Sequence, residues 1–187
     1  ERGIKYFVQS SSCTVYGEPE VLPVRENSPI QQATSPYGNT KQMAEDILRF
    51  TAMAKQVKAI ALRYFNPVGA HESALIGELP NGVPNNLMPF ITQTAAGIRK
   101  QLTVFGNDYP TPDGTCIRDF IHVVDLAKAH VVAINRFFEN KNKADFEYFN
   151  IGTGRGYSVL ELINSFEKTT GVKLNYAIGE RRQGDIT

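Results

Sequence analysis

The chain has 187 residues, of which 42% are hydrophobic, so it is long enough to bury a substantial core. Its 20 basic and 19 acidic residues give a formal net charge of +1. Because the two signs are well mixed along the sequence, no long-range field attracts nucleic acid or an anionic membrane. Any anionic ligand must therefore be bound by local contacts.

The cysteine content and the apolar runs indicate a cytoplasmic protein. Cys13 and Cys116 are too few for a disulfide framework and lack the spacing of metal ligands, which favours a reducing compartment and predicts no metal site. No apolar run approaches the roughly 20 residues that span a bilayer. The first residues also lack the apolar segment of a signal peptide.

Strands and helices are predicted to alternate along the chain, which favours an α/β fold. A turn-rich segment with several prolines separates the first strand from the first helix, and a long loop over 67–85 is of the kind that often has a function. Turn chemistry also marks the end of the last predicted helix, with a Ser158/Glu161 capping box and a terminal Gly171. The predicted strands are 4–10, 57–66, 102–106, 117–123, 146–152 and 173–178, and the predicted helices are 36–54, 85–100, 125–138 and 158–171.

The first predicted helix carries a tyrosine and a lysine one turn apart, in "SPYGNTK". Ser35 or Thr34 can cap this helix, and Pro36 suits its first position. Tyr37 and Lys41 then share one helical face, and a cation beside a phenol favours the phenolate, which is a base. The pair alone is a weak signal, since a Tyr-x-x-x-Lys match often arises by chance.

The apolar residues of the same helix recur at helical spacing on one side. They are Met43, Ile47, Phe50 and Ala54.

A glycine-rich segment, "GTGRGYS" at 152–158, follows a strand and opens a helix, as the phosphate loop of a dinucleotide fold does. Tyr157 stands where that motif needs its third glycine for close helix packing, and no acidic residue closes the next strand in the right place. We therefore do not expect this segment to bind a cofactor.

Six motifs in series resemble one family, the UDP-glucose 4-epimerases of the extended short-chain dehydrogenase/reductases. The resemblance covers essentially the whole chain and is far more specific than the Tyr-x-x-x-Lys pair. The motifs are "SSSCTVYG", "SPYGNTK", "RYFNPVGAH", "PNNLMPFI", "VFGNDYPTPDGTCIRDFIHVVDLA" and "RRQGD".

The resemblance implies a fold and a cofactor, NAD. Residues 1–66 would be the last part of a Rossmann-like parallel sheet, and residues 67–187 mainly a smaller mixed α/β domain that binds a UDP-sugar, with some segments returning to the first domain. The family's glycine-rich NAD loop is missing, and both ends look cut, so we expect a piece of a longer chain that is inactive by itself. Homodimers are common in the family.

The resemblance also implies the residues that do the chemistry. Tyr37 would be the catalytic base, Lys41 would hold the nicotinamide ribose and favour the ionised phenol, and Ser12 would share a short hydrogen bond with the sugar hydroxyl. Tyr64 and Phe65 would lie against the nicotinamide, although a strand end of this kind can also belong to a core.

Further residues match positions around the sugar nucleotide. Phe105 would stack on uracil, and two arginines would grip the diphosphate because guanidinium forks suit phosphate oxygens. From the residues alone, Arg118 could instead pair with Asp119, and Arg181 with Glu180. The proposed substrate residues are Ser12, Thr14, Asn66, Asn86, Leu87, Thr103, Val104, Phe105, Arg118, Arg182 and Asp185.

The implied reaction interconverts UDP-glucose and UDP-galactose by oxidation at C4, rotation of the 4-keto sugar and re-reduction. Alternatives are a nucleotide-sugar 4,6-dehydratase or decarboxylase, or a noncatalytic sugar-nucleotide binding module. A dehydratase typically carries a Thr-Asp-Glu triplet where this chain has "SCT", which lacks the acid and base that expel water.

Overall fold

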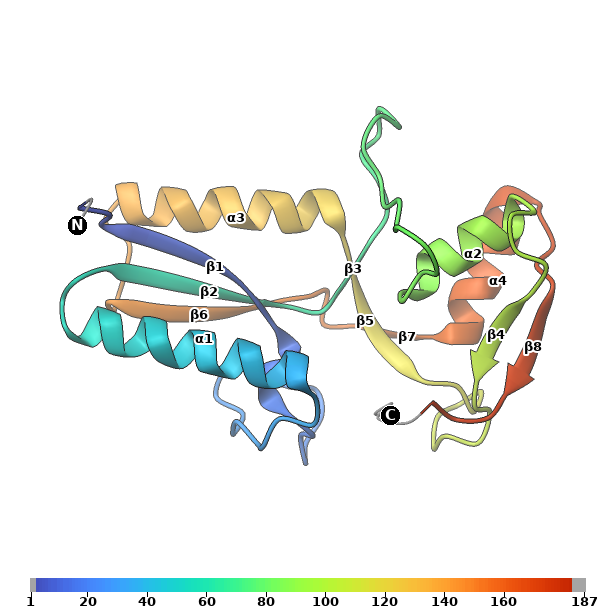
Figure 1. Ribbon diagram of the computed structural model, residues 1–187, viewed down its shortest axis with the longest axis horizontal. Helices are drawn as coiled ribbons and strands as arrows, with labels where there is room; N and C mark the ends of the chain where they lie inside the picture. The colour runs from blue at the N-terminus through green and yellow to red at the C-terminus, as the bar shows by residue number, and fades with distance from the viewer. Residues whose placement is uncertain (1–2, 183–187) are drawn as a thin grey trace. The chain divides into compact units, whose positions relative to one another are not determined.

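The computed structural model describes residues 3–182, and the chain divides into two compact units (Figure 1). Unit 1 comprises Glu1–Pro67 and Ile121–Gly154, and unit 2 comprises Val68–Phe120 and Arg155–Thr187. Each unit is therefore built from two separate stretches of sequence. The assignment of the two parts to the cofactor and the substrate stays a prediction.

Unit 1 contains a parallel sheet of three strands in the order β1-β2-β6. These strands are β1 (Tyr6–Ser12), β2 (Lys58–Tyr64) and β6 (Phe146–Ile151). The central strand β2 has five consecutive buried residues, 59–63. Such a run is typical of a parallel strand that is covered on both faces, and here it ends in a charged residue, Arg63. The expected Rossmann-like α/β fold is confirmed for this part of the chain.

Two helices, α1 (Pro36–Met53) and α3 (Val123–Phe138), cover opposite faces of this sheet (Figure 1). On the α3 side, Ile60 and Leu62 form a buried cluster with Ala133 and Phe137. Because side chains alternate along a strand, Arg63 points to the other face, where it contacts α1.

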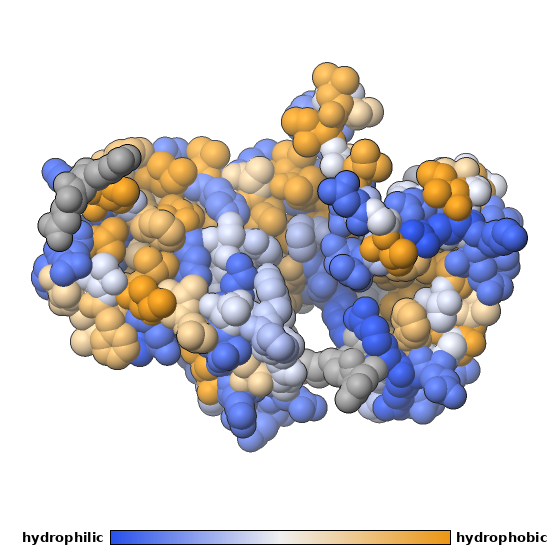
Figure 2. Space-filling model, viewed as in Figure 1, coloured by the Kyte–Doolittle hydropathy of each residue, from blue (hydrophilic) through white to orange (hydrophobic). Residues whose placement is uncertain are grey.

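The apolar side of α1 faces away from the sheet. Met43, Ile47 and Phe50 are 55%, 64% and 59% exposed, while Glu45 is buried against the sheet. Apolar side chains are visible at the surface of unit 1 in Figure 2. The helical spacing of these residues was read correctly from the sequence, but the face that packs on the sheet is the one that carries Glu45.

Unit 2 has its own core between two helices and a parallel pair of strands. The strands are β4 (Leu102–Phe105) and β8 (Tyr176–Gly179), and the helices are α2 (Leu87–Ala95) and α4 (Val159–Thr170). The buried cluster contains Ile91, Leu102, Val104, Ile163 and Leu174. Helix α4 begins with the predicted Ser158/Glu161 capping box and ends at Gly171 in the left-handed region, as the sequence indicated.

A further small sheet has the order β3-β5-β7, with strands β3 (Asn66–Val68), β5 (Ile117–His122) and β7 (Gly156–Ser158). Strand β7 runs antiparallel to β5 and contains the end of the glycine-rich segment that we excluded as a cofactor loop. A Cβ atom on Gly156 would lie 2.3 Å from Ile117 Cγ2, so close strand packing accounts for this glycine. The exclusion of this segment as a cofactor loop stays a prediction.

In residues 3–182, no helix is both long and apolar enough to cross a membrane. The same residues contain no group of three or more His, Cys, Asp or Glu side chains that could hold a metal ion.

Candidate functional site

The carboxyl edge of the unit 1 sheet brings together residues from all three of its strands. In the strand register, Ser12 lies beside Tyr64, and Tyr64 lies beside Ile151. Ligands in open α/β sheets bind outside the carboxyl ends of the strands. The structure therefore places Ser12 and Tyr64 where a ligand is expected.

Ser12 ends β1 and caps the short 3₁₀ helix η1 (Cys13–Tyr16). Its Oγ accepts a hydrogen bond from the Thr14 backbone N–H at 3.2 Å. A hydroxyl has one donor and two acceptor positions, so Ser12 retains its own proton and a lone pair for a ligand. The capping hydrogen bond thus fixes the position of the Ser12 hydroxyl and leaves it able to form hydrogen bonds with a ligand.

Tyr37 and Lys41 lie on the first two turns of α1, whose start follows the predicted chemistry. Ser35 is the N-cap and accepts from the Gly38 backbone N–H at 3.1 Å, and Pro36 is the first helical residue. The Lys41 Nζ lies 5.3 Å from the centroid of the Tyr37 ring and donates to the Ser10 carbonyl at 2.9 Å. The ammonium is therefore held between the phenol and the end of β1.

The first turn of α1 packs closely against η1. A Cβ atom on Gly38 would lie 3.2 Å from the Thr14 carbonyl oxygen, so a small residue lets the helix approach. Thr14 Oγ1 is buried and has no hydrogen-bond partner among the described residues. A buried hydroxyl without a partner is costly, and a ligand hydroxyl is a suitable partner for it.

The aromatic strand end is shared between the core and the site. Tyr64 packs against the buried cluster beneath α3, so it belongs in part to the core, which is the alternative that the sequence left open. It also lies beside Ser12 at the end of the neighbouring strand. The Phe65 backbone N–H donates to the Ile151 carbonyl at 3.1 Å. Asn66 begins β3 directly after these residues.

In unit 2, the predicted substrate residues of β4 alternate between surface and core. Thr103 and Phe105 are exposed on one face, whereas Val104 is fully buried in the core cluster. Val104 can therefore contact a ligand only through its backbone, because its side chain is buried. Asn86 is the N-cap residue of α2, but its side chain accepts no capping hydrogen bond from the helix and instead donates to Glu78 at 2.9 Å. Leu87 is the first helical residue and packs on the core.

The predicted arginines have different surroundings. The Arg118 guanidinium donates to the Ile117 carbonyl at 2.7 Å, and Arg182 lies 6.0 Å from the centroid of the Phe105 ring. Arg181 pairs with Asp108 at 2.7 Å, not with Glu180 as the sequence alone suggested. The hydrogen bond from Arg181 lowers the pKa of Asp108 below its usual value. Asp185 lies outside the described residues.

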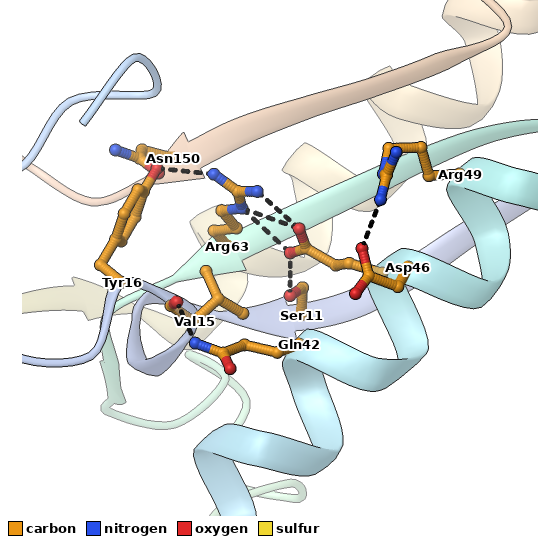
Figure 3. Close-up of polar contacts among 9 residues, drawn as sticks. Ser11, Val15, Tyr16, Gln42, Asp46, Arg49, Arg63 and Asn150 are labelled. Carbon is orange, nitrogen blue, oxygen red and sulfur yellow. Dashed lines mark hydrogen bonds and ion pairs between the residues drawn. The ribbon is translucent and has the colours of Figure 1, made fainter. Parts of the chain in front are cut away.

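A buried polar network beneath the catalytic candidates was not found from the sequence (Figure 3). Arg63 on β2 donates to Glu45 on α1 through Nε at 2.9 Å and through Nη2 at 2.5 Å. Burial opposes the charge of Arg63, but the hydrogen bonds and charge of Glu45 outweigh it and raise the pKa of Arg63. The available signal was an arginine at the end of an otherwise apolar strand, "AIALR".

Burial raises the pKa of Tyr16, another member of this network, despite the hydrogen bond from Arg63. The Tyr16 hydroxyl therefore stays protonated and donates to Asn150 Oδ1 at 2.7 Å.

A parallel sheet with helices on both faces, and a Ser and a Tyr-x-x-x-Lys pair at its carboxyl edge, defines a Rossmann-like α/β enzyme of the short-chain dehydrogenase/reductase type. The family described as the NAD dependent epimerase/dehydratase family matches residues 1–152. The chain belongs to this family.

Individual relatives are more specific. The chain is 53% identical over 185 residues to a UDP-glucose 4-epimerase of Haemophilus influenzae, with 98% of this chain and 54% of the relative covered. It is 54% identical over 181 residues to one from Drosophila melanogaster, with 96% and 51% covered. The chain thus spans about half the length of the curated relatives that it matches.

Solved structures agree with this. The UDP-glucose 4-epimerase of Bifidobacterium longum in complex with NAD+ and UDP superimposes with a TM-score of 0.91 at 50% identity, covering 98% of this chain and 54% of that one. An enzyme from Stenotrophomonas maltophila, with bound NAD and formylated UDP-arabinopyranose, gives a TM-score of 0.93 at 51% identity, with the same coverage.

Proposed function

We propose that the protein to which this chain belongs interconverts UDP-glucose and UDP-galactose with NAD as its cofactor. The observation that carries the proposal is the Lys41 ammonium held between the Tyr37 ring and the end of the strand that carries Ser12. This arrangement occurs in a chain about half identical to several UDP-glucose 4-epimerases.

The residues of unit 1 suit the removal and return of a proton at a sugar hydroxyl. Tyr37 takes the proton of the 4-hydroxyl, and Ser12 shares a hydrogen bond with the same oxygen. Lys41 favours the ionised phenol through its positive charge. Bound NAD would accept the hydride from C4 and return it to the other face of the 4-keto sugar.

Residues at the carboxyl edge of the unit 1 sheet would hold the nicotinamide end of this cofactor. An ammonium has three N–H donors, and Lys41 directs one at the Ser10 carbonyl, so it can also bind the ribose hydroxyls of NAD. Tyr64 and Phe65 would lie against the nicotinamide. Thr14, with its unpartnered buried hydroxyl, would contact the sugar.

Unit 2 would bind the nucleotide. The exposed ring of Phe105 can stack on uracil, and Arg118 and Arg182 supply guanidinium groups for the diphosphate. The other proposed contacts of unit 2 are Asn86, Leu87, Thr103, the Val104 backbone and Asp185, which lies outside the described residues. Asn66, at the end of the first stretch of unit 1, would add a further contact.

We also infer a homodimer in the cytoplasm. The exposed apolar side of α1, formed by Met43, Ile47, Phe50 and Met53, is the observation that supports a dimer.

The test is an assay of the full-length protein with UDP-galactose, with the sugar products followed by proton NMR. We expect UDP-glucose to form, with no net consumption of NAD. Formation of a 4-keto-6-deoxy sugar would support the dehydratase alternative. Binding of UDP-sugars without turnover would support the noncatalytic alternative.

A further inference from the structure

We propose that Glu45 and Arg63 are positioning residues for Tyr37 and Lys41: their buried ion pair fixes α1 on β1 and so sets the place of the base relative to Ser12. This inference rests on the proposed function. Neither residue is among those expected to touch the substrate or the cofactor.

Glu45 ties the catalytic helix to the catalytic strand. It follows Lys41 by four residues and Tyr37 by eight, so it lies near their side of α1 one and two turns further on. Its buried carboxylate accepts from the Ser11 hydroxyl at 2.5 Å as well as from Arg63. Since Ser11 precedes Ser12 directly, one carboxylate connects α1 to the chain neighbour of Ser12.

Arg63 is held on its other side by the end of η1. Its Nη1 donates to the Tyr16 hydroxyl at 3.0 Å, and that hydroxyl donates to Asn150 on β6 (Figure 3). The guanidinium also lies 4.1 Å from the centroid of the Tyr148 ring. Arg63 itself precedes Tyr64, which is the strand neighbour of Ser12. The network therefore joins α1, β1, β2, β6 and η1 at one point.

Stability alone does not require charges at this place. Replacing a buried ion pair by apolar residues of similar volume is often neutral or stabilising, whereas removing one partner is strongly destabilising. Hydrogen bonds are directional, while apolar packing tolerates displacement. A bidentate ion pair therefore suits a role in fixing the position of α1.

The chain offers a matched control in a second Arg–Glu pair. Arg136 on α3 donates to Glu147 on β6 through Nε and Nη2, each at 2.8 Å. This pair also attaches a helix to the sheet, but on the opposite face from α1. The other hydrogen bonds to Glu147 come from Asn142 and Lys143, which lie outside β1, η1 and α1.

The experiment compares four variants of the full-length protein: Glu45→Gln, Ser11→Ala, the double variant Glu45→Leu/Arg63→Met, and Glu147→Gln as control. We expect Glu45→Gln to lower kcat by about 10- to 100-fold with KM for the UDP-sugar within about twofold, because small misplacements of reacting groups cost this much. Ser11→Ala, which changes no charge, should lower kcat in the same sense but less.

The double variant separates positioning from stability. We expect it to melt at or above the temperature of Glu45→Gln while keeping the low kcat. Recovery of both the melting temperature and kcat would overturn the proposal. Glu147→Gln should lower the melting temperature with kcat unchanged, and an equal loss of kcat in this control would also overturn it.

Amide hydrogen exchange provides a readout that does not depend on turnover. In Glu45→Gln, exchange should accelerate in residues 37–45 relative to the rest of the chain, and in Glu147→Gln it should not. Unchanged exchange there would contradict the positioning role even if the parent proved to have another activity. Absence of interconversion in the parent would instead overturn the proposed function.

Discussion

At the scale of single residues, the site depends on where one cation is held. Lys41 contacts the face of the Tyr37 ring and a backbone carbonyl of β1, so its position is fixed by both the helix and the strand. The same two elements carry the proposed base and Ser12. A substitution that removes only the Tyr37 hydroxyl should lower kcat without changing the binding of UDP.

Tyr37→Phe in the full-length protein should lower kcat by about 10² to 10⁴, because general-base catalysis supplies that much and the ring is kept. Steady-state kinetics would give kcat, and calorimetry with UDP would check binding. Tyr6→Phe, on a tyrosine packed against Phe137 of the core, is the control and should retain kcat. Equal kcat for Tyr37→Phe and the parent would exclude Tyr37 as the base.

Arg118→Ala and Arg182→Ala should each weaken UDP binding by about 10- to 100-fold, the range of a lost charged hydrogen bond. NAD content should stay that of the parent. Arg99→Ala is a suitable control, since the Arg99 Nε donates to the Gln93 side chain at 2.7 Å and has no predicted ligand role. Unchanged affinity in both variants, measured by calorimetry, would remove these arginines from the site.

At the scale of elements, the helices of unit 1 are attached to the sheet by different means. Helix α3 packs with apolar residues and adds the Arg136–Glu147 pair, whereas α1 packs through Gly38, Glu45 and Ala52 and leaves its larger apolar side chains outside. A helix with an uncovered apolar side is a candidate for association. The exposed apolar side of α1 predicts a dimer contact, and the ion pair of α3 predicts a stability that depends on pH.

Ile47→Glu in the full-length protein should convert a dimer into a monomer, because it places a charge in the centre of the exposed apolar side of α1. Sedimentation velocity would measure this. Ile98→Glu changes an exposed apolar residue of unit 2 and should leave the dimer intact. A parent that sediments as a monomer would contradict the proposed assembly.

The Arg136–Glu147 pair should contribute stability that depends on pH. The hydrogen bond from Arg136 lowers the pKa of Glu147 below its ordinary value of 4.5. The contribution is therefore present above about pH 4.5 and is lost as pH falls through the lower pKa of the folded state. Urea unfolding of the parent and of Glu147→Gln should show their difference in stability shrinking below pH 4.5. A difference that stays constant down to pH 3 would contradict this.

At the scale of the whole molecule, the two units supply different parts of the proposed reaction. Unit 1 carries the residues that are proposed to move protons, and unit 2 carries the aromatic and basic residues that are proposed to bind the nucleotide. Among the described residues, β1 and β6 each pair with β2 alone, so both edges of this parallel sheet are unpaired.

The 187-residue chain by itself should show no NAD-dependent epimerase activity. Its only segment resembling a phosphate-binding glycine loop contributes to β7 and the start of α4, so no such loop remains for the pyrophosphate of NAD. An assay of the purified chain with added NAD, beside the full-length protein, would test this. Turnover by the purified chain would overturn the placement of the cofactor.

Local chemistry explains what the sequence by itself determined. The order of strands and helices, the Ser35 cap with Pro36, and the Ser158/Glu161 box with Gly171 depend on residues a few positions apart. The six motifs likewise identified the family correctly. Interactions between near neighbours are readable because the chain itself brings them together.

Only the tertiary structure decided which side of each element is covered and which charges meet. Glu45 and Arg63 are 18 residues apart, and Arg181 and Asp108 are 73 apart, so no local pattern pairs them. The burial of Val104 between exposed neighbours and the outward apolar side of α1 depend in the same way on packing. Periodicity shows that a helix has an apolar side and a polar side. Which side is buried depends on the element that the helix packs against, because burial is a property of the assembled layers.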